Sequence, residues 1–176
     1  MSRQQPITTF RARVATSASP DVVYRSLADL GTHLIWAGDQ SRQKTFRLLS
    51  LEAPGREATV GDHFSSTGSN ILSMQFADHS VVVEAEPGQR FGFDTESRLA
   101  RKHRPTLETR FRHRYLLAPT PGGTSISYAC EVWPQNYLPW WLRWGQRPMT
   151  KLMAQRSIRR NMKNLARLAE SVPAQP

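Results

Sequence analysis

Four side chains of this sequence could carry acid–base chemistry: His113, Tyr115, Tyr128 and Asp62. The alternation of TRFRHRYLLA predicts a strand that places His113 and Tyr115 on one face. A neutral imidazole in a partly dry site can accept a proton or orient a carbonyl group, and a tyrosine hydroxyl can donate to an oxygen. A hydrogen-bonded core histidine is the alternative. Asp62 has the alternation of Phe64 and is expected inward, where an acid near His113 would permit catalysis.

Metal and nucleotide chemistry are not indicated. The five histidines stand at 33, 63, 79, 103 and 113, and none of their spacings is that of metal ligands. The sequence contains no glycine-rich phosphate loop and no nucleophile elbow. Cys130 alternates with apolar residues, which indicates a structural thiol. We therefore expect no metal and no other cofactor.

Strands must position these side chains. Alternating runs bounded by glycine and proline turns predict strands at 7–16, 44–53, 60–67, 79–86, 90–95 and 107–118, and a seventh carrying Ile126 to Val132. Ser19 and Pro20 begin a short helix, and residues 29–38 form a second helical turn that carries Trp36. A long amphipathic helix is predicted over 149–171.

Consecutive strands joined by short turns predict an antiparallel meander with one apolar face. The C-terminal helix is long enough to cover that face, so we expect an α+β helix-grip fold: a curved sheet of about seven strands, two short helices and the long helix around a cavity. The residues expected to line the cavity are Trp36, Phe64, Phe91, Phe93, Phe111, His113, Tyr115, Tyr128 and Met153.

Several motifs, in this order, resemble a known family: ASPDVVYRSLADL, HLIWAG, VGDHFSSTGSN, VVVEAEPGQRFGFDTES, RHRYLLAPTPGGTSISYACEV and NMKNLARLAE. They are similar to the START-like (SRPBCC) superfamily, which includes the plant pathogenesis-related allergens, and in particular to its polyketide cyclase/dehydrase and lipid-transport branch. The resemblance runs from about Phe10 to Glu170. It implies a scaffold with a ligand cavity and no common catalytic set.

The segment 134–148 is unusually aromatic and is bracketed by prolines. Trp140, Trp141 and Trp144 have three interpretations: a lid over the cavity, an anchor in a membrane interface, or a contact with a second subunit. The lid is preferred. We predict one domain over 1–176, with strands and short helices in 7–133, this aromatic segment, and the closing helix in 149–171.

The chain is strongly basic, with a formal net charge of +10 and 20 arginines among its 24 basic residues. Because the arginines are scattered and no nucleic-acid motif accompanies them, a solvated surface is expected and specific nucleic-acid binding is not. No apolar run is long enough to span a bilayer, no secretory signal is evident, and there is a single cysteine, so a cytoplasmic protein is expected.

The expected function is binding of a hydrophobic small molecule, lipid-like or polyketide-like, by a carrier or sensor. One alternative is a polyketide cyclase or dehydrase in which His113 and a tyrosine move protons in the same cavity. A second alternative is a peripheral module that makes weak contact with a membrane surface through the tryptophans and the excess of arginine.

Overall fold

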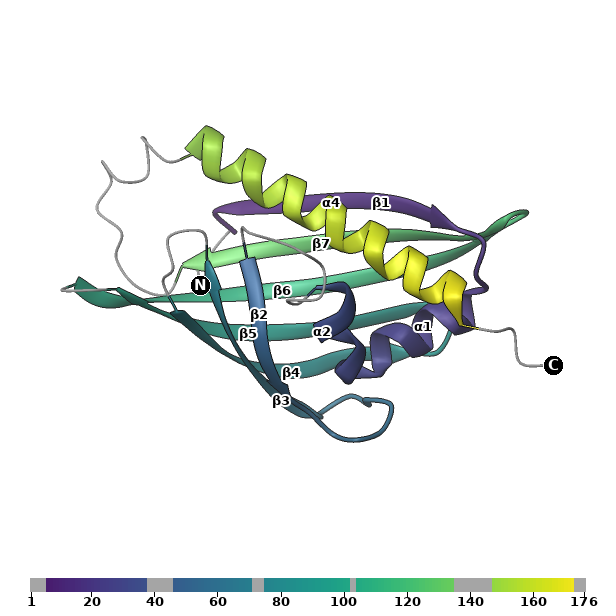
Figure 1. Ribbon diagram of the computed structural model, residues 1–176, viewed down its shortest axis with the longest axis horizontal. Helices are drawn as coiled ribbons and strands as arrows, with labels where there is room; N and C mark the ends of the chain where they lie inside the picture. The colour runs from purple at the N-terminus through teal and green to yellow at the C-terminus, as the bar shows by residue number, and fades with distance from the viewer. Residues whose placement is uncertain (1–5, 38–45, 71–74, 102–103, 135–146, 173–176) are drawn as a thin grey trace, which may run out of the picture.

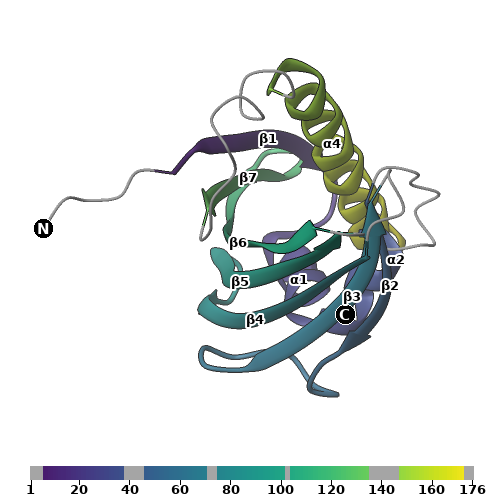
Figure 2. The same cartoon turned by 90° about the vertical axis from the view of Figure 1, so that its left-hand side faces the viewer.

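Seven strands form one antiparallel sheet in the order β1-β7-β6-β5-β4-β3-β2 (Figure 1) in the computed structural model, which describes residues 6–37, 46–70, 75–101, 104–134 and 147–172. The strands are β1 (Thr8–Thr16), β2 (Phe46–Glu52), β3 (His63–Asn70), β4 (Gln75–Glu86), β5 (Arg90–Arg101), β6 (Arg104–Thr120) and β7 (Gly123–Pro134). The sheet curls, and β1 and β2 are its two edges (Figure 2).

The helices lie on the inner, concave side of this sheet. They are α1 (Pro20–Ala28), η1 (Leu30–Thr32), α2 (His33–Trp36) and α4 (Arg147–Ser171). The long helix α4 lies across the sheet beside β1 (Figures 1 and 2) and also contacts α1 and α2. The amide of Gln155 donates to the carbonyl of Arg11 at 2.6 Å, and that of Asn164 donates to the carbonyl of Trp36 at 3.2 Å. These bonds tie α4 to β1 and to α2. No helix in the described part of the chain is both long and apolar enough to cross a membrane.

The hairpin of β5 and β6 is longer than the sequence analysis predicted. Its strands were expected at 90–95 and 107–118, but they pair from Arg90 and Leu116 out to Arg101 and Arg104. The alternation continues through this basic stretch, because Leu99 stays on the inner face while Arg98 stays outside and pairs with Glu108 at 3.6 Å. Residues 96–101 and 104–106, which lay outside the predicted strands, are therefore part of the sheet.

A β-bulge at Val83 decides which way Glu84 points. Val82 lies opposite Phe93 and Glu84 opposite Gly92, so Val83 is an extra residue between two consecutive pairs. Plain alternation would put Glu84 on the face of Val82, but the bulge turns it to the outer face. There it pairs with Arg114 at 3.0 Å.

The outer face carries a ladder of ion pairs across β4, β5 and β6. Arg110 pairs with Glu96 at 2.7 Å, and Arg112 with Asp94 at 3.5 Å. Arg114 reaches both Glu84 and Asp94 at 3.0 Å. The row of three arginines on β6 is thus matched by acids on its neighbours and faces away from the helices.

The core is densest between α1, the C-terminal half of α4 and the nearest ends of β5 to β7. Leu27, Phe91, Ile126 and Leu165 have no exposed surface. Ring contact between Phe91 and Tyr24, 6.2 Å between centroids and nearly perpendicular, joins the sheet to α1.

Candidate ligand-binding site on the inner face of the sheet

The side chains on the inner face are buried at one end of the strands and partly exposed at the other. On β6, Leu117 and Tyr115 are buried, whereas His113 and Phe111 are partly exposed. The same change occurs on the neighbouring strands and on α4. We call the buried end, marked by Phe91, Leu117, Ile126 and Ala169, the closed end, and the partly exposed end, marked by Phe76, Leu99, Phe111, Val132 and Met153, the open end. A ligand on this face would therefore lie toward the open end.

His113 stands at the boundary between the two ends. Its Nδ1 lies 2.7 Å from the Tyr128 hydroxyl, and its ring stacks on Phe93 with centroids 4.4 Å apart. Burial of the ring, reinforced by the nearby His33 and Arg114, lowers the pKa of His113 to about 3. The imidazole is therefore neutral near pH 7, with one nitrogen donating and the other accepting.

Two tyrosine hydroxyls accompany this imidazole. The rings of Tyr115 and Tyr128 lie 4.7 Å apart, and burial raises the pKa of both hydroxyls well above the usual value, so both stay protonated. Tyr128 bonds to His113, whereas the Tyr115 hydroxyl has no hydrogen-bond partner among the described residues. Tyr115 is thus a donor without an acceptor in the part of the chain that the structure describes.

The inner face of β3 to β5 carries polar side chains among its apolar ones, and sequence reasoning missed its carboxyl group, Asp78. In the sheet register Asp78 lies between Ser66 and Ser97, and beyond it the hydroxyls of Ser80 and Thr95 are 2.8 Å apart. The Oδ1 atom of Asp78 is buried and has no hydrogen-bond partner among the described residues. Burial raises the pKa of Asp78 to about 6, although a bond from Ser97 and the charge of His79 oppose this.

Asp78 was missed because the predicted strand began at His79, four residues after the start of β4 and one residue beyond Asp78. The signal was present: Phe76, Asp78, Ser80 and Val82 alternate with more exposed residues, so continuing the pattern backward would have placed Asp78 inside.

Replacing Asp78 with asparagine is expected to raise the free energy of unfolding at about pH 8 by about 1–3 kcal/mol, because the wild-type protein buries an ionised carboxylate there. The folded pKa lies above the ordinary value, so this cost appears as pH rises through about 6 and is absent below about 4. Urea unfolding at about pH 8 and at a pH below about 4 measures this cost. Asp94→Asn on the outer face is the matched control and should give no gain. An equal gain from Asp78→Asn at both pH values would contradict the burial argument.

The other candidate catalytic residue, Asp62, lies outside this cluster. It precedes β3, where Arg56 holds its carboxylate with two bonds of 2.7 and 2.8 Å and the backbone N–H of Thr59 donates to it at 2.7 Å. These bonds keep the pKa of Asp62 well below its usual range. The structure does not bring Asp62 to His113.

The remaining predicted lining residues divide between the two ends. Trp36 and Phe64 are buried beside the boundary, with ring centroids 6.4 Å from Tyr115 and 5.2 Å from Phe93, respectively. Met153 and Phe111 are at the open end, whereas Phe91 lies within the closed end. Trp140, Trp141 and Trp144 lie outside the described residues.

Two further titratable side chains are buried near the site. His33 contacts the rings of Trp36, Phe64 and Phe93, and its Nε2 donates to the carbonyl of Leu27 at 2.9 Å. Burial lowers the pKa of His33 to about 4 and raises that of the Cys130 thiol to about 11. Within the described residues, no three His, Cys, Asp or Glu side chains are grouped to hold a metal ion.

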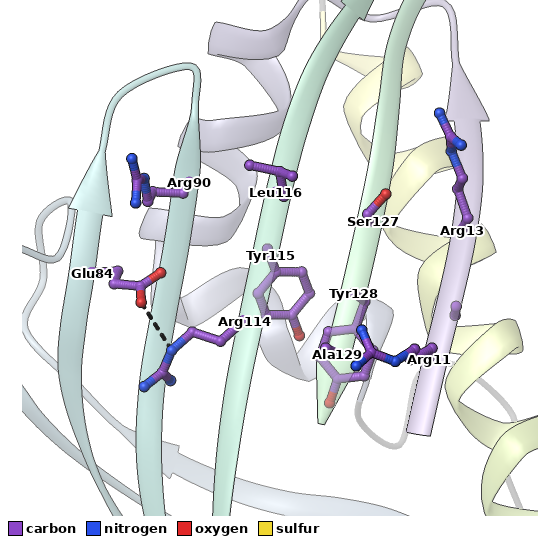
Figure 3. A pocket seen from close by; sticks show the side chains of 11 residues that line it. Arg11, Arg13, Glu84, Arg90, Arg114, Tyr115, Leu116, Ser127, Tyr128 and Ala129 are labelled. Carbon is purple, nitrogen blue, oxygen red and sulfur yellow. Dashed lines mark ion pairs between the residues drawn. The ribbon is translucent and has the colours of Figure 1, made fainter. Parts of the chain in front are cut away.

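A separate hollow of about 660 Å3 lies on the outer face (Figure 3). Its outward-facing lining residues are Arg11, Arg13, Glu84, Arg90, Arg114, Leu116, Ser127 and Ala129. Tyr115 and Tyr128 also border it, although the alternation of their strands directs their rings to the inner face. The hollow is wide open and bordered by charged side chains, and it is not the cavity expected under α4.

Comparisons with known proteins agree with this fold. Residues 8–170 match the family described as polyketide cyclase / dehydrase and lipid transport. A conserved protein of Geobacillus kaustophilus has a TM-score of 0.70 at 11% identity, with 93% of this chain and 95% of that chain covered. A protein of Chromobacterium violaceum gives 0.61 at 20% identity over 93% and 99%, and Ara h 8.0201 gives 0.62 at 11% over 94% and 99%. No curated protein sequence matches the chain. The structural likenesses confirm the predicted helix-grip fold.

Proposed function

The chain belongs to the polyketide cyclase/dehydrase and lipid transport family, and from that premise we propose that it binds an apolar small molecule at the open end of its inner face. The observation that carries the proposal is the hydrogen-bonded pair of neutral His113 and Tyr128, which lies where the inner face becomes accessible. Beside it, the Tyr115 hydroxyl has no acceptor among the described residues. Such a ligand buries its apolar surface against the aromatic rings, which contributes about 25 cal/mol per Å2 before the cost of association.

The polar groups constrain the ligand further. The Tyr115 hydroxyl can donate to a carbonyl or hydroxyl oxygen of the ligand, and His113 can donate or accept through its second ring nitrogen. Across the face, the hydroxyls of β3 to β5 and the carboxyl of Asp78 accept hydrogen bonds. An oxygenated ring system or a lipid with a polar end fits this division better than a pure hydrocarbon.

Blocking the open end is expected to weaken ligand binding strongly. In Thr109→Trp a large ring is added to the inner face beside Phe111, so the affinity for the neutral apolar dye N-phenyl-1-naphthylamine should fall about tenfold or more. Dye fluorescence measures the affinity, and native mass spectrometry of the purified wild type identifies a retained ligand. Arg110→Trp, one residue along the same strand, adds the same ring to the outer face and should bind the dye as the wild type does. Equal binding by both variants would refute a site at the open end.

A cyclase or dehydrase is the second candidate, favoured by the presence of two titratable groups on one face. The pKa of Asp78, about 6, is near the working pH, so its carboxyl group can take up or release a proton, whereas His113 stays neutral and can orient a carbonyl group. A poly-β-carbonyl compound added to wild type, His113→Asn and Asp78→Asn distinguishes the candidates. Product from the wild type but not the variants indicates an enzyme, whereas binding without product indicates a carrier.

A further inference from the structure

The excess positive charge of the chain is concentrated on α4. That helix contains seven basic residues and one acidic residue, in a chain whose formal net charge is +10. On the sheet, by contrast, Arg90, Arg110 and Arg114 each pair with a glutamate. Most of the unbalanced charge therefore lies on one element.

The cations of α4 are arranged on one exposed face. Arg156, Arg160, Lys163 and Arg167 follow one another at intervals of three or four residues, and Arg159 stands next to Arg160. With Asn164 these five cations line a shallow hollow of about 350 Å3. We call these five residues the basic face. None of them forms an ion pair with an acid in the described part of the chain. Glu170, the acid of this helix, is held by Thr16 at 2.9 Å and by the backbone N–H of Ser17 at 3.1 Å.

Such an arrangement opposes helix stability, because like charges three or four residues apart repel each other. Within α4 the charge of Glu170 acts on Arg167, and the opposite side of the helix, with Met162, Leu165 and Ala166, packs into the core. A partner with negative charge would remove the repulsion and would bind along the helix.

We propose that the basic face docks α4 on the surface of a bilayer that contains anionic phospholipid. From Arg156 to Arg167 the cations span about 16 Å along the helix axis, so α4 can lie in the plane of the headgroups with all five in reach of phosphate. Leu152, one turn before Arg156 on the same side, is 51% exposed. An apolar side chain beside cations suits the boundary of headgroups and acyl chains, and it has no role against the phosphates of a nucleic acid.

Docking through this face would serve the proposed function. The docking itself is argued from the charges of α4, and only its purpose depends on the proposed function. The opposite side of α4 covers the inner face of the sheet, and Met153 lies at the open end. A sparingly soluble ligand is most concentrated in a membrane, so docking would bring the open end to its source.

Vesicle flotation tests the proposal with two variants of equal charge. The α4 variant is Arg156→Gln/Arg160→Gln/Lys163→Gln, and the control is Arg11→Gln/Arg13→Gln/Arg90→Gln on the outer face of the sheet. On phosphatidylcholine vesicles with about 30 mol% phosphatidylglycerol, the α4 variant should bind about a hundredfold more weakly than wild type, since each cation contributes about fivefold at an anionic surface. The control should stay within about threefold, and neutral vesicles should bind neither.

Equal losses in the two variants would show attraction by overall charge and would overturn the proposal. So would tighter binding of wild type to duplex RNA than to the anionic vesicles at the same salt concentration. Leu152→Ser should weaken vesicle binding while leaving RNA binding unchanged.

Dye binding in the absence of vesicles separates this proposal from the proposed function. The α4 variant should bind dye normally, and loss of dye binding in Thr109→Trp does not depend on docking.

Discussion

Replacement of Phe91 by alanine is expected to lower the free energy of unfolding by about 3–5 kcal/mol, the cost of deleting a fully buried aromatic ring. Phe91 has no exposed surface and packs on Tyr24 of α1, with ring centroids 6.2 Å apart. The cavity would therefore open where sheet and helices meet. Urea unfolding followed by circular dichroism gives the change from the midpoint and slope.

Phe111→Ala is the matched control, because it deletes the same ring from the open end. Phe111 is partly exposed, so its loss should cost less than about half as much as that of Phe91. Dye binding should show the opposite order: Phe91→Leu, which keeps most of the buried volume, should bind as wild type does, and Phe111→Ala should bind more weakly. Equal destabilisation by the two alanine variants would contradict the division into a closed and an open end.

Acidification from about pH 7 to about pH 4.5 is expected to lower the free energy of unfolding by about 3–4 kcal/mol through groups around the site. The folded pKa values of His33 and His113 are about 4 and about 3, below the ordinary value of 6.5. As pH falls below 6.5, the two histidines bind protons in the unfolded chain but not in the folded chain. The free energy of unfolding therefore decreases until the pH reaches the folded pKa values. Asp78 acts in the opposite direction, because its folded pKa of about 6 lies above its ordinary value.

Urea unfolding as a function of pH tests this sign and its origin. His33→Gln can retain the bond to the Leu27 carbonyl without a titrating ring, and His113→Asn likewise removes a proton acceptor. Between about pH 6.5 and about pH 4.5, each variant should lose about 2–3 kcal/mol less of its free energy of unfolding than the wild type does. His63, which is exposed at the start of β3, provides the control, and His63→Gln should leave the slope unchanged. Stability that rises on acidification, or equal slopes in all four proteins, would show that the two rings are not held neutral by burial.

The strands and their inner faces could be predicted because a half-buried sheet imposes a period of two on the sequence. The pattern Phe111, His113, Tyr115 identified the inner face of β6, and the long amphipathic helix identified its cover. Both depend on neighbours along one strand or helix. The helix-grip architecture follows from these local patterns, and the resemblance to a known family pointed to the same arrangement.

The composition of the site depended on contacts that no single strand determines. Tyr128 stands opposite Tyr115 in the register, but its hydroxyl bonds to His113, a diagonal neighbour. The stacking of His113 on Phe93 likewise requires the pairing of β5 with β6. Asp62 has the alternation of an inward residue, yet it precedes the strand and is held by Arg56, so the rule did not apply to it. In each of these cases the deciding contact came from a residue outside the strand itself.

The bulge at Val83 has a consequence for how the chain should be compared with its relatives. Because Val82 and Glu84 already face consecutive residues of β5, a relative lacking one residue here would keep both pairings and both faces. An alignment would show a single-residue gap inside a strand, a place where gaps are usually penalised. If the gap is opened at this position, Asp78 is aligned with inner-face residues of the relatives and Glu84 with outer-face residues.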